Sequence, residues 1–216
     1  MDIEEFYDNW NPEEFPDYIK ILMEFADRLI KNEIKKLLVE EPKFVLDCGC
    51  GFGAFYELTK DHNTLYLDIS FYQLKKFKIK EKKICSNMLY LPFKNEVFDL
   101  ILCINVLEHV NYKRALEEMF RVLKKGGRII VVVINKNRLI NEEIFTEFKI
   151  YHQPLSIKDF YNINFYTSVY FLPSFFKILP SRILKVFLKY WIFVDRFLSK
   201  LFKDKGLFLI IEMVKK

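Results

Sequence analysis

The sequence lacks long uncharged apolar runs, and it lacks an apolar leader at its start. No stretch of about 18 uncharged apolar residues occurs, so no membrane-spanning helix is expected. The opening residues, MDIEEFYDNW, are acidic and do not resemble a signal peptide. Internal repeats and low-complexity segments are also missing. These absences predict a cytoplasmic protein, with peripheral contact to a membrane left open.

Cysteine is scarce, and the charge is nearly balanced. The 4 cysteines among 216 residues favour free thiols in a reducing compartment. The pair Cys48 and Cys50, followed by the lone Cys85 and Cys103, matches no common metal-binding spacing, so no metal ion is expected. The net charge is +5, from 34 basic and 29 acidic residues. Proteins that bind nucleic acids usually concentrate more positive charge, so a nucleic-acid partner is not expected.

Short apolar runs alternate with amphipathic segments through most of the chain. Strands are expected at 44–49, 64–70, 83–86, 97–106 and 128–135. Helices are expected at 17–39, 52–61, 71–82 and 112–127, the last ending at a Gly-Gly pair. This alternation predicts a Rossmann-like α/β fold, in which a mostly parallel sheet carries helices on both faces. Ligands of such sheets bind at the carboxyl ends of the strands.

A glycine-rich stretch, VLDCGCGFGA, coincides with the end of the first expected strand. Gly49, Gly51 and Gly53 permit positive φ and let a ligand approach the backbone. Asp68 ends the next strand, where a carboxylate can accept both hydroxyls of a ribose. The stretch fits the G-x-G-x-x-[GA] pattern, so NAD is one candidate ligand. S-adenosylmethionine is another, because Asp47 suits its ammonium group, and a glycine-rich turn without a ligand is the third interpretation.

Four sequence segments follow one another in a fixed order along the chain: DCGCGFG, LYLDIS, NMLYLPFKNEVFDLILCINVLEHV and LKKGGRIIVVV. Together they resemble the class I S-adenosylmethionine-dependent methyltransferases, especially the small-molecule group with an LPF…FDLI…LEHV signature. The resemblance covers residues 44–134, with weaker likeness at 152–160 and 206–216. It implies a seven-stranded sheet with an antiparallel last strand at 206–216, and methyl transfer from S-adenosylmethionine that leaves S-adenosylhomocysteine. An NAD-linked oxidoreductase and a non-catalytic, cofactor-binding member remain alternatives.

The resemblance also implies a cofactor site. Its expected residues are Asp47, Gly49, Cys50, Gly51, Gly53, Asp68, Ile69, Asn87, Met88, Ile104 and Asn105. Asp68 should bind the ribose hydroxyls, and Ile69 should cover the adenine. Asn87 stands where many members carry Asp, and its amide oxygen can still accept the adenine N–H. Cys48 and Cys50 are expected to fill tight positions around the loop.

The acceptor is expected to be a small or lipophilic molecule. Methyl transfer is an in-line displacement, so a base is required only where the acceptor must lose a proton. His109, in LEHV, and His152, in YHQP, are candidate catalytic groups, although a structural role also fits His109. Tyr7 lies in an N-terminal segment that often closes over the site in this family, with ordinary packing as the alternative. No [DN]-P-P-[YFW] tetrapeptide follows the fourth strand, which argues against methylation of adenine N6 or glutamine.

An aromatic and basic segment spans residues 165–203. Read as a helix after Pro180, it places six cations on one narrow stripe: Arg182, Lys185, Lys189, Arg196, Lys200 and Lys203. The rest of this helix is largely apolar. One interpretation packs it on the sheet or on a second subunit of a homodimer. The other makes residues 181–203 a lid or a membrane-surface helix that presents a lipid-like acceptor.

A single methyltransferase domain is expected to span residues 1–216. Residues 1–40 should form an N-terminal helical cap, and residues 44–135 the cofactor-binding core. Residues 136–205 should form a substrate-side region with the aromatic helical insertion, before the final strand at 206–216.

Overall fold

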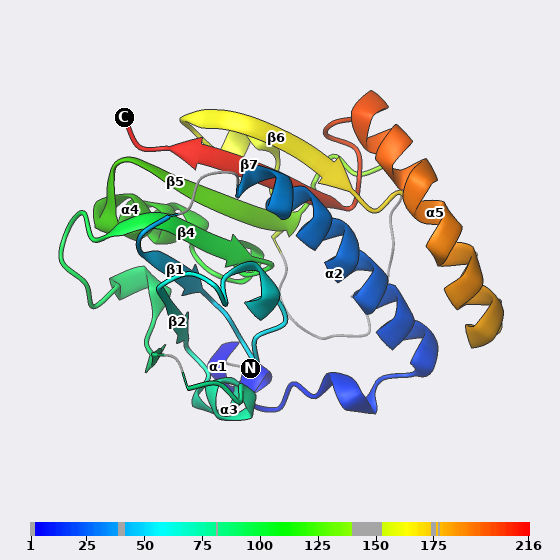
Figure 1. Cartoon of the computed structure of the whole chain (residues 1–216), viewed down its shortest axis with the longest axis horizontal. Helices are drawn as coiled ribbons and strands as arrows, with labels where there is room; N and C mark the ends of the chain where they lie inside the picture. The colour runs from blue at the N-terminus through cyan, green and yellow to red at the C-terminus, as the bar shows by residue number, and fades with distance from the viewer. Residues whose placement is uncertain (1–2, 39–41, 81, 140–152, 174–175, 177) are drawn as a thin grey trace.

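A seven-stranded sheet organises the chain (Figure 1). The computed structural model describes residues 3–38, 42–80, 82–139, 153–173, 176 and 178–216. The strands are β1 (Val45–Cys48), β2 (Thr64–Asp68), β3 (Lys83–Cys85), β4 (Phe98–Ile104), β5 (Leu123–Ile134), β6 (Ile163–Val169) and β7 (Phe208–Val214). Their order is β3-β2-β1-β4-β5-β7-β6, and β7 runs antiparallel to both neighbours while the other pairs are parallel. The predicted Rossmann-like α/β sheet with an antiparallel last strand is confirmed.

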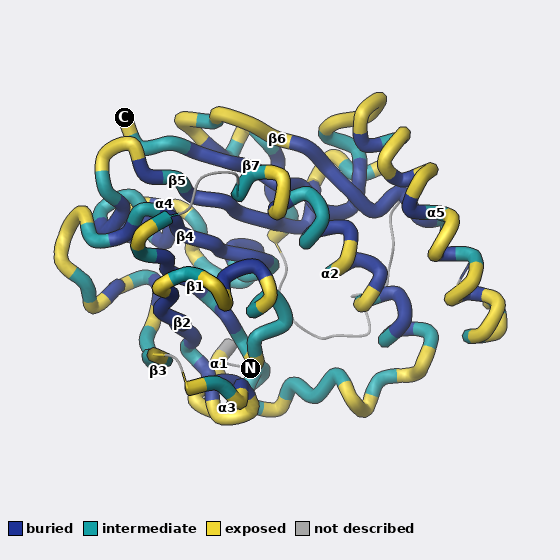
Figure 2. The backbone as a smooth tube through the Cα atoms, viewed as in Figure 1, coloured by how far each residue is buried: buried dark blue, intermediate teal, exposed yellow. Residues whose placement is uncertain are grey.

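The central strands send alternate side chains into two apolar cores, one on each face of the sheet. On β4, Leu100 and Leu102 belong to one core, whereas Ile101 and Cys103 belong to the other. Figure 2 shows these strands buried along almost their whole length. Because both faces are covered, the strand sequences are continuously apolar rather than alternating, as expected of a parallel sheet inside an α/β fold.

Helices cover both faces of the sheet. The first core is closed by α2 (Asp17–Leu37) and α5 (Ser181–Leu201), and the second by α4 (Tyr112–Val122). The buried residues of α2 recur at helical spacing: Ile19, Ile21, Leu22, Phe25, Ala26, Leu29, Ile30 and Ile34. Each large apolar side chain buried in this way stabilises the fold by about 1.5–3 kcal/mol. None of the described helices is both long enough and apolar enough to cross a membrane.

Short helical elements surround the carboxyl ends of the strands. These are α1 (Ile3–Asp8), α3 (Phe71–Lys76) and the 3-10 turns η1 (Pro12–Glu14), η2 (Tyr56–Leu58), η3 (Met88–Tyr90), η4 (Leu107–His109) and η6 (Ile157–Asp159). The helix α3 begins at a proper cap, because the Ser70 hydroxyl accepts the Gln73 N–H at 3.1 Å. It ends six residues earlier than the predicted range of 71–82.

The helix predicted at 52–61 does not form. The segment makes turns closed by bonds three residues apart, from Tyr56 N–H to the Gly53 carbonyl at 3.0 Å and from Leu58 N–H to the Phe55 carbonyl at 2.9 Å. Gly53 has φ +88°, outside the helical region, and no side chain caps the start of η2. A turn, rather than the N-terminus of a regular helix, therefore follows the glycine loop.

The helix predicted at 112–127 ends at Val122 instead of at the Gly-Gly pair. Leu123 is already extended, with ψ 137°, and pairs with Phe98 of β4. The two glycines belong to β5, where Gly126 N–H donates to the Lys215 carbonyl at 2.8 Å. Pairing with strands on both sides therefore overrides the local preference of this segment for helix.

Candidate active site

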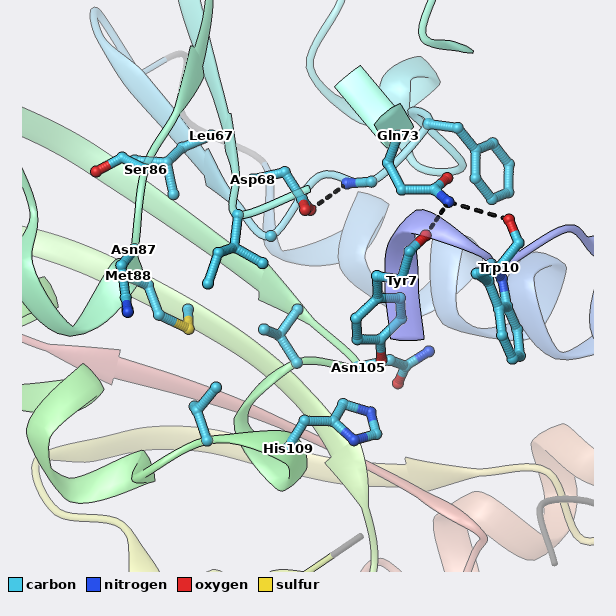
Figure 3. Close-up of a pocket in the computed structure, with 16 residues that line it drawn as sticks. Tyr7, Trp10, Leu67, Asp68, Gln73, Ser86, Asn87, Met88, Asn105 and His109 are labelled. Carbon is cyan, nitrogen blue, oxygen red and sulfur yellow. Dashed lines mark hydrogen bonds between the residues drawn. The ribbon is translucent and has the colours of Figure 1, made fainter. Parts of the chain in front are cut away.

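A cavity opens at the carboxyl ends of β1, β2 and β4, where the fold class predicts a ligand (Figure 3). Its walls come from the glycine loop, the ends of β2 and β3, the loop after β4, and the N-terminal segment. The predicted residues that line it are Gly49, Gly51, Asp68, Ile69, Asn87, Met88, Asn105, His109 and Tyr7. The fold thus brings together most of the residues that the sequence pointed to.

The glycine loop owes its shape to positive φ angles and to bonds from β2. Gly49 N–H and Cys50 N–H both donate to the Leu67 carbonyl, at 2.7 and 3.0 Å. Gly49 has φ +86°, and a Cβ there would lie 2.4 Å from the Val106 side chain. Gly51 has φ +53°, but a Cβ there would meet nothing within 4 Å. Close packing against Val106 therefore requires glycine at position 49. At position 51 the missing side chain leaves open space, and the backbone there lines the cavity.

Gly53 and Asp47 lie outside the lining of this cavity. A Cβ on Gly53 would lie 2.2 Å from the Phe77 ring, so this glycine permits close packing of the loop on Phe77. Asp47 is 3% exposed, and burial, followed by the charge of Asp68, raises its pKa to about 7. Direct contact of these two residues with a cofactor remains a prediction.

Asp68 is held in place by the backbone of its surroundings (Figure 3). Its two carboxylate oxygens accept the N–H groups of Gly51 and Ser70, at 2.7 and 2.9 Å. Burial raises the pKa of Asp68, and these backbone hydrogen bonds oppose the rise. Each carboxylate oxygen retains further acceptor capacity, so the side chain can bind a pair of vicinal hydroxyls.

The opposite end of the cavity suits a flat heterocycle. Ile69, Met88 and Val110 give it apolar walls, and Met88 is buried. The Asn87 side-chain oxygen accepts the Leu89 N–H at 2.9 Å, which caps η3 and fixes the orientation of this amide. The arrangement fits an adenine ring covered on its faces and met at its edge by an amide.

The N-terminal segment covers the cavity, and Gln73 fastens it there. The Gln73 side-chain amide donates to the Tyr7 carbonyl and, at 3.0 Å, to the Trp10 carbonyl (Figure 3). Asp8 accepts the hydroxyl hydrogen of Ser70. Gln73 was not among the predicted site residues, because nothing in the local sequence links α3 to residues more than sixty positions earlier. Tyr7 and Trp10 therefore both line the cavity, and closure of this segment over a ligand remains a prediction.

A second cavity shares part of its lining with the first. Gly49, Gly51, Asn105, His109 and Tyr7 line both. The second cavity adds apolar and aromatic walls from Phe6, Met23, Phe55, Ile104, Ile134 and Phe208. Cys50 also lines it, with a buried thiol whose pKa is raised by burial and then by the charge of Asp47. An apolar compartment thus adjoins the cavity that suits a nucleoside.

Two carboxyl groups line this second cavity, Glu108 from η4 and Asp27 from α2. Glu108 is 1% exposed, and neither of its side-chain oxygens has a hydrogen-bond partner among the described residues. Burial raises the pKa of Glu108 to about 7; the backbone N–H groups of Glu108 and Ile134 oppose the rise without reaching hydrogen-bond geometry. Burial likewise raises the pKa of Asp27 to about 6, against the opposing charge of Lys31. From its place in the LEHV segment, Glu108 fits either a base or a structural partner, and the sequence favours the structural role.

The catalytic candidates have different outcomes. His109 lines both cavities, and its ring lies 5.7 Å from the Tyr7 ring in an edge-to-face arrangement. The pKa of Tyr7 is raised, first by burial and then by the charges of Glu108 and Asp68, so its hydroxyl stays protonated near neutral pH. A catalytic role for Tyr7 remains a prediction. His152 lies outside the described residues. Asn105 adopts φ +56° and lines both cavities, and its buried side-chain oxygen has no hydrogen-bond partner in the described part of the chain.

The four cysteines do not gather into a site. Cys48, Cys50 and Cys103 are buried, Cys85 is exposed, and all four are free thiols. Within the described part of the chain, no three His, Cys, Asp or Glu side chains come together as metal ligands. Cys48 and Cys103 belong to the second apolar core, on the face of the sheet that α4 covers, so they pack as small apolar residues.

Comparisons with known proteins agree with this geometry. A methyltransferase domain family matches residues 46–131. An uncharacterized protein of Methanocaldococcus jannaschii is 63% identical over 222 residues, covering 99% of each chain. A probable tRNA methyltransferase 9B of Mus musculus is 35% identical over 95 residues, which cover 41% of this chain and 21% of that one. A Thermotoga maritima crystal structure, described as a SAM-dependent methyltransferase and possible histamine N-methyltransferase, has a TM-score of 0.67 at 18% identity and covers 100% of both chains.

The fold and the site define an α/β enzyme that binds a nucleoside cofactor at the carboxyl ends of its strands. The chain belongs to the class I S-adenosylmethionine-dependent methyltransferases. Its cofactor is S-adenosylmethionine, and the glycine loop, Asp68 and the apolar adenine end fit that molecule. The interpretation as an NAD-linked oxidoreductase is therefore wrong.

Proposed function

We propose that the chain transfers a methyl group from S-adenosylmethionine to a small organic acceptor bound in the second cavity. The observation that supports this proposal is a pair of cavities with shared lining residues, one suited to an adenosyl group and one lined mainly by apolar side chains. S-adenosylmethionine supplies an already activated methyl group, so the protein mainly aligns the acceptor and excludes water. Tyr7, Trp10 and Phe52 line both cavities and provide apolar walls for that purpose.

Each part of the cofactor has residues that would hold it. Asp68 would accept the ribose hydroxyls, and Ile69 and Met88 would contact the adenine. The backbone at Gly49 and Gly51 would lie against the methionine part, because only small residues leave room for a ligand there.

Glu108 is the group that we assign to the acceptor. A buried carboxyl without a hydrogen-bond partner costs stability, so its place in the cavity wall favours a ligand that satisfies it. Its pKa of about 7 allows it to accept a hydrogen bond or take up a proton near neutral pH. An acceptor with N–H or O–H groups on an apolar body fits a cavity that combines the carboxyl groups of Glu108 and Asp27 with aromatic walls.

His109 is the second group that can move a proton, since it lines both cavities beside Glu108 in η4. Tyr7 has a raised pKa and would donate a hydrogen bond from its neutral hydroxyl. The role of His152 stays a prediction.

RNA is a second candidate acceptor, because at least four relatives are named tRNA methyltransferases or probable tRNA methyltransferases. Their alignments cover 41% to 46% of this chain, less than half of its length. A small molecule is favoured because the second cavity is bounded mainly by apolar side chains rather than by cations.

Methyl transfer can be tested with methyl-labelled S-adenosylmethionine. The protein is incubated separately with a deproteinised small-molecule cell extract and with total tRNA. We expect label in the small-molecule fraction, reduced at least about tenfold by Glu108→Gln. The matched control Glu57→Gln changes an exposed carboxylate of the turn η2 and should leave the rate unchanged. Label in tRNA alone would refute the small-molecule proposal, and binding of S-adenosylhomocysteine without label in either fraction would support the non-catalytic alternative.

A further inference from the structure

The helix α5 is anchored by its inner face, which fixes the direction of its outer face. Leu184, Leu188 and Ile192 are buried in the core shared with α2 and β6. The Asp195 carboxylate accepts the backbone N–H groups of Tyr170 and Phe171, at 3.2 and 2.8 Å. Figure 1 shows α5 at the edge of the molecule, beside α2 and away from the centre of the sheet.

The outer face of α5 is apolar and exposed. Its six residues are between 56% and 65% exposed and recur at helical spacing: Ile183, Val186, Tyr190, Phe193, Phe197 and Leu201. At 1.5 Å per residue, such a row extends for about 27 Å along the helix. Contiguous exposed apolar surface of this kind marks a site of interaction rather than ordinary exposure.

The flank of this face carries only positive charge. The cations Arg182, Lys185, Lys189, Arg196, Lys200 and Lys203 are all exposed. None of them forms an ion pair with another described residue. The only acidic residue of α5, Asp195, is buried on the inner face. The sequence pattern predicted the cationic stripe, but not which of the apolar residues would stay exposed.

We propose that the outer face of α5 binds an anionic lipid surface. A row of large apolar and aromatic side chains can enter the boundary between head groups and acyl chains, while the adjacent cations meet anionic head groups. A second copy of the chain could cover the apolar face, but its α5 offers no exposed carboxylate to pair with these cations. In an antiparallel pair of α5 helices, both cationic flanks would also lie on the same side and repel each other. An RNA would match the cations but leave the aromatic row exposed. This inference concerns a surface outside both cavities and does not depend on the proposed acceptor.

Vesicle flotation tests the inference with the full chain. Neutral phosphatidylcholine vesicles are compared with vesicles that also contain phosphatidylglycerol. We expect binding to the anionic vesicles only, weakened by added salt. The triple variant K185E/K189E/R196E should bind more than about 100-fold more weakly, since each cation near an anionic surface contributes about a fivefold factor.

Two further variants separate the alternatives. K78E/K94E/K125E makes the same charge change at exposed lysines elsewhere and should retain at least half of the binding. F193S/F197S keeps every cation but removes two exposed rings, and it should weaken binding at least about tenfold. Retained binding of S-adenosylhomocysteine and an unchanged Tm show that each variant is folded. The inference fails if anionic vesicles do not bind, if both charge variants lose binding equally, if tRNA binds in place of vesicles, or if F193S/F197S converts a dimer to a monomer.

Discussion

The Asp68 carboxylate should be the largest single contributor to cofactor affinity, and Asp68→Ala tests this directly. The side chain is 8% exposed and is positioned by the N–H groups of Gly51 and Ser70. Replacement by alanine removes both acceptor oxygens while leaving the cavity open. Asp68→Asn keeps the shape, but its amide offers one acceptor oxygen where the carboxylate offers two.

The expected magnitude follows from the number of hydrogen bonds lost. Two ribose hydroxyls donating to a carboxylate make two charge-assisted bonds, each contributing about 1.5–3 kcal/mol. Asp68→Ala should therefore weaken S-adenosylhomocysteine binding by about 3–6 kcal/mol, or about 150- to 20,000-fold. Asp68→Asn should lose about half of that free energy, because one neutral acceptor remains.

Calorimetric titration with S-adenosylhomocysteine, S-adenosylmethionine and NAD measures the effect. We expect the two adenosyl ligands to bind the unaltered chain and NAD not to bind. Asp61→Ala, in an exposed turn, is the matched control and should bind normally. Circular dichroism verifies that the variants fold, since Asp68→Ala also leaves two N–H groups without their acceptor. Binding within about threefold of the unaltered chain by Asp68→Ala would refute the assignment of Asp68 to the ribose.

Three further predictions concern stability and closure. Glu108→Gln should raise the unfolding free energy at pH 8 by up to about 3 kcal/mol but leave it unchanged near pH 4. The reason is that the pKa of Glu108 is raised from 4.5 to about 7 in the folded chain, so its ionisation makes folding less favourable as the pH rises through this window. Equal denaturant midpoints for the variant and the unaltered chain at pH 8 would contradict this. Gly49→Ala should lower Tm and abolish S-adenosylhomocysteine binding, because the added Cβ would overlap the Val106 side chain. In the control Gly126→Ala the Cβ has open space, so the variant should lose only about 1–2 kcal/mol of unfolding free energy for its positive φ. Similar losses in both variants would argue against the overlap. Gln73→Ala should speed proteolysis near Trp10 and weaken cofactor binding about tenfold, because two hydrogen bonds to the N-terminal segment are lost; unchanged cleavage would show that Gln73 does not hold the lid.

The local sequence pattern was sufficient to predict those features that depend mainly on neighbouring residues along the chain. The apolar runs of β4 and β5 predicted buried strands because both faces of the sheet are covered. The spacing of Gly49, Gly51 and Asp68 predicted a nucleoside site because consecutive parallel strands end at the same edge. The same local reading was wrong at 52–61 and at 123–127, where Gly53 and the pairing of β5 with its neighbouring strands override helical preference.

Tertiary structure decided the features that depend on contacts between distant segments. Gln73 fastens a segment 66 positions earlier, a relation that no local spacing records. For Glu108, the sequence is compatible with both a base and a structural partner. Only the tertiary structure shows that its carboxyl is buried beside an apolar cavity, without a hydrogen-bond partner among the described residues. For α5, the sequence showed the cationic stripe and the apolar residues. Which apolar residues pack on α2 and which face outward depends on the tertiary structure. Burial is a property of the whole folded chain. The sequence therefore determined the cofactor class, while the second cavity and the exposed face of α5 are known only from the tertiary packing.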